Sequence, residues 1–498
     1  MNLKSNLMQY RDAGYPIIFI ESYEEDKADK IIGEIADSAR VQVIEWNGAV
    51  GACDFKTKKK KAGSHKLMLD EFLETVSKDE LNRRIIVIKD MNDQLAEFQT
   101  VALLKQLAIR IASGSASECM IIMISPTLFI PKDLEKYITV LEQDYIDDND
   151  INEIIKNFVK ENGLPPVAPE LIRKLAATFK GLTEMEINNI LSLAFSTHGS
   201  ITQKDLDFIF EQKKQMIMKS GILEMVPLKE TVDDIGGLEN LKEWLRRKSV
   251  VFNDIARAES FGVGMPKGLL IAGVPGCGKS LTAKATAMLF NVPLLKLDMG
   301  RLMGKYVGES ESNMRNALKL AEAISPCVLW IDELEKAFAG IGSQGGNEVT
   351  TRLFGSFLTW MQDKTAPAFV IATANDITKM PPELLRKGRF DEIFFVDLPN
   401  QTERKMIFNV HIKKRRKNDF PNIDIPKLVS MTEGYSGADI EGVVRDGIEN
   451  AFCDGKDKVT TEYISQAIKN TTSLSEIMKD DLKKMKDEYT KRRLKNAT

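Results

Sequence analysis

The segment that most constrains the fold of this 498-residue chain is Gly273-Val-Pro-Gly-Cys-Gly-Lys279-Ser280. It fits the pattern G-x-x-x-x-G-K-[ST], which joins a buried strand to a helix through a glycine-rich turn. The chain supplies both neighbours, because the apolar run 268–272 precedes the turn and a helical run, 281–290, follows it. Such a turn directs backbone N–H groups and the positive end of a helix at phosphate groups. The sequence therefore predicts an α/β domain that binds phosphate.

Each residue of this turn has an expected role toward a nucleoside triphosphate. Lys279 is expected to reach the β- and γ-phosphates, and Ser280 to offer its hydroxyl to Mg²⁺. The glycines let the backbone turn its N–H groups inward around the phosphates. The other residues of this segment expected to bind the nucleotide are Gly273, Pro275, Gly276, Cys277, Gly278 and Leu281.

A second apolar strand, 327–331, ends in the adjacent acids Asp332 and Glu333. We expect Asp332 to hold the Mg²⁺ shell, so that it and Ser280 form the metal-binding pair. Glu333 is expected to orient the attacking water or to accept its proton. A lone acidic pair after a strand commonly just meets solvent at a loop, but the upstream phosphate-binding turn favours the catalytic interpretation.

Two further motifs extend the predicted active site. Asn375 follows the strand predicted over 369–373, at the edge where ligands of open α/β sheets bind, and its amide can hold the γ-phosphate or the attacking water. An isolated Asn in such a place is more often a turn former. Arg386 and Arg389 flank a glycine turn. Alone they would be a solvated surface pair, but with the preceding motifs they resemble arginine fingers, which stabilise charge on a transferring phosphoryl group.

These motifs stand in the order found in the AAA ATPases, and the chain resembles that family from about residue 231 to residue 471. Residues 232–238 are similar to the strap that leads into the family's domain, where the equivalents of Ile235 and Gly236 frame adenine. Residues 434–439 resemble its lid motif, which implies that Gly437 and Ala438 lie at the nucleotide base. Finer details resemble uncharacterised AAA proteins of chloroplast and cyanobacterial genomes and their bacterial relatives.

The resemblance implies an AAA+ module of the P-loop NTPases, with a parallel sheet, helices on both of its faces and a helical lid, that uses ATP and Mg²⁺. It also implies a homo-oligomeric ring, usually a hexamer, in which Arg386 and Arg389 reach the ATP of a neighbouring subunit. Residues 305–310 resemble the first pore loop, so that Tyr306 and Val307 would grip a client protein. The alternative is that Tyr306 is half-buried at the start of a helix.

The first half of the chain repeats this order of elements without the motifs. Laying 179–190 over 432–443 aligns Gly181 with Gly434, as in a duplicated unit. Acids follow the first strand-like run in place of a glycine turn and would repel phosphate. We interpret this half as a degenerate AAA-like α/β unit that does not hydrolyse ATP; the alternative is an unrelated α/β adaptor. The strand-like runs of the first half are 17–21, 41–46, 85–88, 120–124 and 137–141, and those of the second half are 268–272, 294–298, 327–331, 369–373 and 392–396.

The sequence also suggests where the domains begin and end. We expect the amphipathic C-terminal helix to pack on its own lid. The predicted segments are a degenerate AAA-like domain without a P-loop over 1–145, a lid-like helical segment over 146–215, a linker over 216–230, an AAA+ core over 231–400, a helical lid over 401–472 and a charged C-terminal helix over 473–498.

Composition argues against several other classes of protein. The 69 Lys and Arg residues against 72 Asp and Glu residues leave a net charge of −3, which argues against a chain built to bind nucleic acid or an anionic membrane. The five cysteines lack a C-x-x-C pair, and the three histidines are scattered, so we expect each histidine to be structural or at the surface. Apolar runs fall short of the roughly 18 residues of a transmembrane helix. We expect a cytoplasmic protein, or a stromal one if a plastid genome encodes it.

We therefore expect a Mg²⁺-dependent ATPase that forms a homo-oligomer and remodels or threads a protein client. Two alternatives remain for the output of the ATPase cycle. One is a nucleotide-switched scaffold or regulator whose N-terminal unit binds partners. The other is a nucleic-acid motor, which the near-neutral net charge disfavours.

Overall fold

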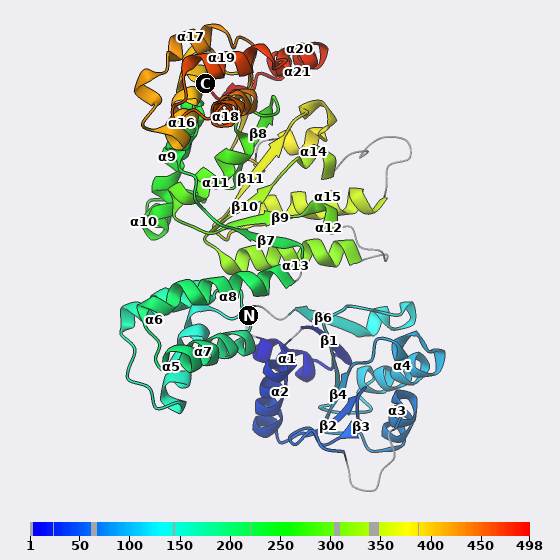
Figure 1. Cartoon of the computed structure of the whole chain (residues 1–498). Helices are drawn as coiled ribbons and strands as arrows, with labels where there is room; N and C mark the ends of the chain where they lie inside the picture. Colours follow the sequence, from blue (N-terminus) through cyan, green and yellow to red (C-terminus); the bar gives the residue numbers. More distant parts are fainter. Residues whose placement is uncertain are drawn as a thin grey trace. The chain divides into compact units, whose positions relative to one another are not determined.

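The computed structural model describes residues 3–22, 24–60, 67–142, 145–219, 221–302, 309–337, 348–386 and 388–498. They belong to two compact units, Met1–Tyr145 and Ile146–Thr498, each with a mainly parallel sheet (Figure 1). Within the described residues, no helix has both the length and the apolar character that crossing a membrane requires.

Unit 1 contains a six-stranded sheet in the order β3-β2-β4-β5-β1-β6. Its neighbouring strands are parallel, except that β2 and β3 are antiparallel. Helices α1 (Leu3–Asp12) and α2 (Glu25–Ala39) cover one face, and α3 (Leu69–Lys78) and α4 (Phe98–Ala112) cover the other. The strands are β1 (Ile17–Glu21), β2 (Gln42–Asn47), β3 (Gly51–Cys53), β4 (Arg84–Lys89), β5 (Met120–Ser125) and β6 (Ile138–Glu142).

Side chains of these strands alternate between the two faces, because the side-chain period of a strand is two residues. Ile17 and Phe19 belong to the core beneath α3 and α4, whereas Ile18 and Ile20 belong to the core beneath α1 and α2. Both faces of the sheet are therefore buried, as continuous apolar runs predict for parallel strands.

Unit 2 begins with four helices that have a hydrophobic core of their own. Asp147 caps the first by accepting hydrogen bonds from the N–H groups of Asn149 and Asp150, and Thr183 and Glu186 form a capping box at the third. These helices are α5 (Asp148–Glu161), α6 (Pro169–Phe179), α7 (Glu184–His198) and α8 (Leu206–Lys219).

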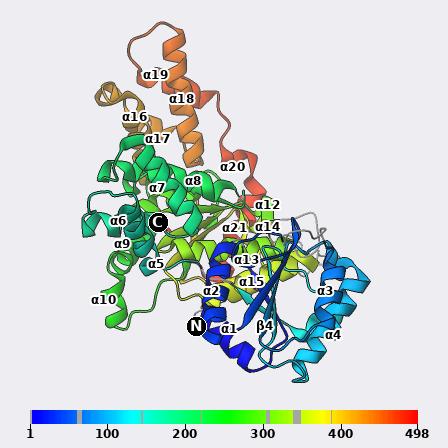
Figure 2. The same cartoon turned by 90° about the horizontal axis from the view of Figure 1, so that it is seen from below.

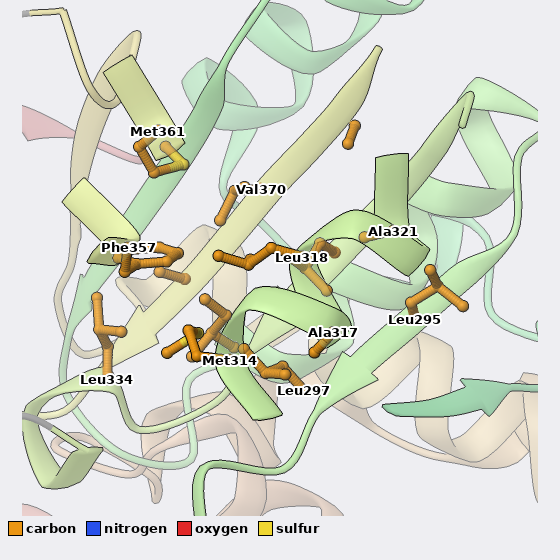
Figure 3. Packing of buried hydrophobic residues seen from close by; sticks show 14 of the residues in the cluster. Leu295, Leu297, Met314, Ala317, Leu318, Ala321, Leu334, Phe357, Met361 and Val370 are labelled. Carbon is orange, nitrogen blue, oxygen red and sulfur yellow. The ribbon is translucent and has the colours of Figure 1, made fainter. Parts of the chain in front are cut away.

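The larger part of unit 2 is a seven-stranded sheet in the order β13-β12-β8-β11-β10-β9-β7. Helices α9 (Glu239–Asn253) and α11 (Lys279–Phe290) pack on one face, and α13 (Glu309–Ile324) and α15 (Glu348–Asp363) pack on the other. Figure 3 shows the second of these cores, where Met314 and Leu318 of α13 gather with Val370 of the sheet. The strands are β7 (Leu223–Val226), β8 (Gly268–Gly273), β9 (Leu294–Leu297), β10 (Cys327–Ile331), β11 (Ala368–Ala374), β12 (Glu392–Val396) and β13 (Lys495–Asn496).

The two sheets share one topology. Numbered in chain order, the five parallel strands of unit 1 lie side by side as 2-3-4-1-5, in β2-β4-β5-β1-β6. The corresponding strands of unit 2 have the same order, in β9-β10-β11-β8-β12. The predicted fold class, an AAA+ module preceded by an AAA-like α/β unit, is therefore confirmed.

Four helices follow β12 and form a lid with a separate core, seen together in Figure 2. Ser436 accepts a hydrogen bond from the N–H of Asp439, whose carboxylate accepts one from the N–H of Ser436, so that α18 begins at Gly437. The lid helices are α16 (Gln401–Arg416), α17 (Ile425–Ser430), α18 (Gly437–Cys453) and α19 (Thr461–Lys469).

Two expectations about the ends of segments were wrong. The predicted linker 216–230 contains the end of α8 and the strand β7, which pairs antiparallel with β9. The C-terminal helix α21 (Lys479–Arg492) packs on the α/β core, where Tyr489 stacks on Phe395 with 4.5 Å between ring centroids, and not on the lid. An amphipathic pattern shows that one face is buried, but it does not show which surface buries it.

Candidate active site

The glycine-rich turn 273–280 connects the end of β8 to the start of α11. Gly273 has a φ of 141°, and a Cβ at this residue would overlap the backbone carbonyl of Val396. Gly276 and Gly278 also have positive φ values, 73° and 85°. Glycine adopts such values without the steric cost that a side chain would add, so the backbone can wrap inward at the N-terminus of α11.

Lys279 is the first residue of α11 and is buried. Its Nζ donates hydrogen bonds to the carbonyls of Gly273 and Val274, both over 2.8 Å. Burial lowers the pKa of Lys279 to about 8, although nearby Cys277 and the acids Glu335, Asp332 and Glu333 act in the opposite direction. The ammonium group is therefore held at the turn by carbonyls that an anionic ligand can replace.

The acids predicted to act in catalysis follow β10. Asp332 accepts a hydrogen bond from the hydroxyl of Thr373, and the hydroxyl of Ser280 donates to its Oδ1 over 3.3 Å. The backbone N–H of Glu333 donates to Thr373 Oγ1 over 3.2 Å, and Glu333 has a positive φ of 51°. This left-handed backbone is uncommon for a residue with a side chain and is found disproportionately at functional sites.

Two residues hold the side chain of Glu333. Asn375, directly after β11, donates its amide to Oε1 over 3.3 Å. Lys336 forms an ion pair with Oε2 over 2.7 Å. The backbone N–H of Asn375 in turn donates to Oε1 of the buried Glu335 over 3.0 Å. Burial raises the pKa of Glu335, whose Oε2 has no hydrogen-bond partner among the described residues.

These residues surround a cavity of about 470 Å³ between the core and the lid. Every residue that the sequence analysis expected to bind the nucleotide lines this cavity, except Gly273. The carbonyl of Gly273 accepts a hydrogen bond from Nζ of the lining residue Lys279. The lid contributes Gly437 and Ala438, and the N–H of Ala438 donates to the carbonyl of Gly276 over 2.9 Å. The strap residues Ile235 and Gly236 also line the cavity, and Gly236 packs closely against the lid residue Ile407.

Several lining residues were not predicted from the sequence. His411 was expected to be structural or at the surface, but it lines the cavity from α16. Burial lowers its pKa, and Nη1 of Arg415 lies 3.1 Å from its Nδ1, within hydrogen-bond distance. The other unpredicted lining residues are Asp234, Leu238, Thr373, Asp397, Pro399, Glu403, Ile407, Val410 and Glu441.

Two of the expected functional residues are not brought to this cavity. Arg386 and Arg389 are absent from the described residues that line it, and Nη1 of Arg389 donates to the carbonyl of Glu383. Tyr306 and Val307, expected to contact a client, lie outside the residues that the structure describes.

The donor set of the cavity fits a hard divalent cation beside a triphosphate. Mg²⁺ prefers oxygen ligands and usually takes only one or two from the protein, with the remainder from phosphates and water. The hydroxyl of Ser280 and the carboxylate of Asp332 already face each other at the start of α11. Burial raises the pKa of the neighbouring Cys277 to about 12, so its thiol stays neutral and adds no repulsion toward phosphate.

The corresponding place in unit 1 has the opposite arrangement of charge. Asp90, after β4, has a positive φ of 52°, as Glu333 has after β10, and it follows Lys89, the last residue of β4. The buried Lys89 pairs with Asp29 over 2.8 Å and with Glu25 over 3.3 Å, and both acids belong to α2. In unit 1 the end of the strand is therefore basic and the start of the helix is acidic. In unit 2 the end of the strand is acidic and the start of the helix is basic.

Four models of protein families match separate ranges of this chain. Residues 269–398 match the ATPase family associated with various cellular activities (AAA), and residues 422–466 match the AAA+ lid domain. Residues 3–143 match the N-terminal domain of SpoVK-like AAA ATPases, and residues 149–220 match the second domain of the same proteins.

Individual relatives resemble the chain over different lengths. The uncharacterised AAA domain-containing protein ycf46 of Pyropia yezoensis is 37% identical over 499 residues, which covers 100% of both chains. The protein of the same name from Trieres chinensis is 35% identical and covers 100% of this chain and 99% of its own length. The proteasome-activating nucleotidase of Saccharolobus solfataricus is 33% identical over 60% of this chain and 76% of its own length.

Proposed function

Because this chain belongs to the AAA ATPase family, we propose that it works as a ring of subunits that couples Mg²⁺-dependent ATP hydrolysis to the remodelling or threading of a protein client. The observation that carries this proposal is the cavity in which Lys279 and Ser280 face Asp332, Glu333 and Asn375. We expect this activity in the cytoplasm, or in the stroma if a plastid genome encodes the protein.

The chemistry follows from the groups around the cavity. Lys279 exchanges its two carbonyl partners for phosphate oxygens, which places its positive charge beside the transferring phosphoryl group. Ser280 and Asp332 would hold Mg²⁺, which when bound neutralises charge on the phosphates. Glu333 orients the attacking water and takes up its proton, while Asn375 holds the Glu333 carboxylate in place.

The proposed oligomer follows from the two arginines. Arg386 and Arg389 are absent from the described lining of their own cavity, so they can act as fingers only on the cavity of a second subunit. Arginine fingers supplied by a second subunit accelerate related phosphoryl transfers by about 10³- to 10⁵-fold. This acceleration corresponds to a decrease of about 4 to 7 kcal/mol in the activation barrier. A dissociated subunit should therefore be nearly inactive.

The proposed client is a protein because of the relatives. One relative is named a proteasome-activating nucleotidase and another a homologue of cell division cycle protein 48. We place the client contact at Tyr306 and Val307. A nucleotide-switched scaffold is the second candidate, favoured by unit 1, where two lysines are already paired with acids: Lys89 with Asp29 and Glu25, and Lys58 with Asp29 and Glu45.

Glu333→Gln tests the proposed hydrolysis. The variant should bind ATP with the affinity of the wild-type protein and turn it over at least about 10²-fold more slowly, because the general base is lost. Steady-state phosphate release and equilibrium binding separate the two effects. Turnover at the wild-type rate would contradict the role of Glu333.

The same variant, held with ATP, provides a trap for clients. Tyr306→Ala should keep basal hydrolysis and lose stimulation by a trapped client, whereas Tyr306→Phe should keep both. Assembly that depends on ATP, with no unfolding of a fluorescent test protein, would favour the scaffold.

A further inference from the structure

The last residues of the chain form part of the sheet that carries the candidate active site. Lys495 and Asn496 of β13 pair with Phe394 and Phe395 of β12, in parallel. The next residue, Ala497, is fully buried, and its N–H donates to the carbonyl of Phe395 over 3.0 Å. The C-terminal segment is therefore held as an edge strand.

This edge strand also contacts the start of α9. The carbonyl of Ala497 accepts a hydrogen bond from the N–H of Leu241 over 3.1 Å. The side-chain amide of Asn240 donates to the carbonyls of Asn496 and Thr498. Since the strap with Ile235 and Gly236 leads directly into α9, the strand is tied to a segment that lines the cavity.

The buried carboxylate of Glu403, at the start of the lid helix α16, connects these parts. Its Oε1 accepts hydrogen bonds from the N–H of Leu238 over 3.0 Å and from the hydroxyl of Thr498 over 2.8 Å. Its Oε2 accepts one from the N–H of Asn400 over 3.0 Å. Glu403 and Leu238 both line the cavity, so the hydroxyl of Thr498 lies one hydrogen bond away from its wall.

The strap that Glu403 holds is tightly placed. Leu238 has a φ of 59°, which costs free energy for a residue with a branched side chain. A Cβ at Gly236 would lie 2.5 Å from Cγ1 of Ile407 on α16. Hydrogen bonds to a buried carboxylate are among the stronger ones in proteins, so the pair of donors on Oε1 helps to hold this strap against the lid.

The same C-terminal segment is anchored to the lid at its other end. The N–H of Leu474 donates to Oδ2 of Asp439, the last residue of the lid motif 434–439, over 3.2 Å. Lys486 of α21 pairs with the cavity residue Asp397 over 2.9 Å. Residues 473–498 therefore run from the lid across the core, and they touch two residues that line the cavity, Asp397 and Glu403.

We propose that the C-terminal strand is a latch for the nucleotide base: Thr498, acting through Glu403, is a positioning residue that preorganises the strap where Ile235 and Gly236 line the cavity. This inference rests on the proposed binding of ATP in that cavity. The phosphate end is built from the turn 273–280 and from β10, which Thr498 does not touch. The latch therefore strengthens the binding of a ligand that carries a nucleotide base, and it has no effect on the binding of a polyphosphate without one.

Thr498→Val tests the latch, with Thr498→Ser as the matched control. Valine keeps the shape of threonine but removes the donor to Glu403, whereas serine keeps the donor. Both are made in the full chain with Glu333→Gln, so that ATP is not consumed. The affinities for Mg-ATP and for Mg-tripolyphosphate are measured by calorimetry. We expect Thr498→Val to weaken ATP binding by about five- to tenfold, the usual effect of losing one hydrogen bond, and to leave tripolyphosphate binding unchanged.

A second variant acts on the strand without touching Glu403. Asn240→Ala removes the donor to Asn496 and Thr498, and we expect a loss of about two- to threefold in affinity for ATP alone. Hydrogen exchange at the N–H of Leu241, which is bonded to Ala497, should slow when ATP is added but not when tripolyphosphate is added. Thermal unfolding without a ligand verifies that each variant is folded.

The outcomes separate the latch from the proposed function. The latch proposal is wrong if Thr498→Val binds ATP as tightly as Thr498→Ser, or if its affinities for ATP and tripolyphosphate fall by the same factor. Either result would leave the proposed binding of ATP intact. If the protein with Thr498 intact binds neither ligand, the proposed function fails and the latch fails with it.

Discussion

Asn375 donates its side-chain amide to Oε1 of Glu333 over 3.3 Å, which joins the ends of two neighbouring parallel strands. Glu333 follows β10 and Asn375 follows β11, so the register of the sheet places an amide beside the carboxylate that acts on water. In this pair, the position of the Asn375 amide determines how the Glu333 carboxylate can act on water.

Removal of the Asn375 amide should slow hydrolysis without preventing nucleotide binding. We expect Asn375→Ala to lower kcat by about 10²-fold, the usual effect of losing one hydrogen-bond donor at a site of developing charge. The affinity for ATP should change little, because Asn375 does not belong to the phosphate-binding turn. Phosphate release and calorimetric binding measure the two quantities. A matching loss in affinity would show that Asn375 acts mainly in binding.

Glu335 should position Asn375 through the backbone. Glu335→Ala leaves the N–H of Asn375 without its buried acceptor, which should lower the free energy of unfolding by about 1 to 3 kcal/mol and also reduce kcat. Glu335→Gln keeps an acceptor oxygen and should preserve most of both. Urea unfolding and steady-state kinetics test this comparison. Equal behaviour of the two variants would argue against a positioning role.

Lys336 should restrain Glu333 in the nucleotide-free state. The ion pair between Nζ and Oε2 lies at the surface, where such pairs contribute about 0.2 to 1 kcal/mol. Lys336→Ala should therefore raise basal hydrolysis by at most about fivefold, because Glu333 becomes free to orient water. Lys336→Arg preserves the charge and serves as the control. A fall in basal hydrolysis would indicate that Lys336 assists the reaction.

Binding of ATP should weaken at alkaline pH. Burial lowers the pKa of Lys279 from 10.5 to about 8, and only the ammonium form attracts phosphate. The affinity should therefore be constant below pH 8 and fall above it, by up to about tenfold per pH unit, because binding then requires uptake of a proton. Titrations at pH 7, 8 and 9 in buffers of different ionisation enthalpy measure both effects. Lys279→Met should bind weakly at every pH and show no such slope.

The same shift adds to the stability of the ligand-free protein as the pH rises above about 8. A lysine with a lowered pKa binds fewer protons in the folded state than in the unfolded state between about pH 8 and pH 10.5, so its contribution to stability increases across that window, whereas buried cysteines with raised pKa values, such as Cys277, contribute in the opposite direction above about pH 9. Lys213 and Lys364 are also buried, with pKa values lowered to about 8, and they contribute in the same direction. Denaturant unfolding at pH 7.5 and pH 9.5 should show this increase, and Lys279→Met should reduce it.

The longer strands of both sheets could be predicted from the sequence, whereas three of the shortest ones could not. A strand such as β10 is an apolar run bounded by turn residues, and the predicted range 327–331 equals the observed one. β3, β7 and β13 are two to four residues long, and their pairing partners decide whether they form. β7 therefore appeared in the sequence as part of a linker.

Residues at the base end of the cavity had no motif that could reveal them. Glu403 and His411 lie on an ordinary-looking lid helix, and Glu403 bonds to Leu238, 165 residues away. The basic end of strand β4 at Lys89 could be compared with the acidic strand end of unit 2 only after the two sheets were found to share one strand order. In each case the missing information was the identity of a distant neighbour.

By itself the sequence determined the chemistry of the phosphate end, because that chemistry depends on eight consecutive residues, 273–280, and on short motifs at strand ends. The tertiary structure alone decided which residues complete the base end and where residues 473–498 run. Those features depend on contacts between segments far apart in the chain, such as Thr498 with Glu403, and such contacts leave no periodicity or spacing in the sequence. Local backbone geometry can be read from neighbouring residues, whereas the surface that a segment packs against is set by the folding of the whole domain.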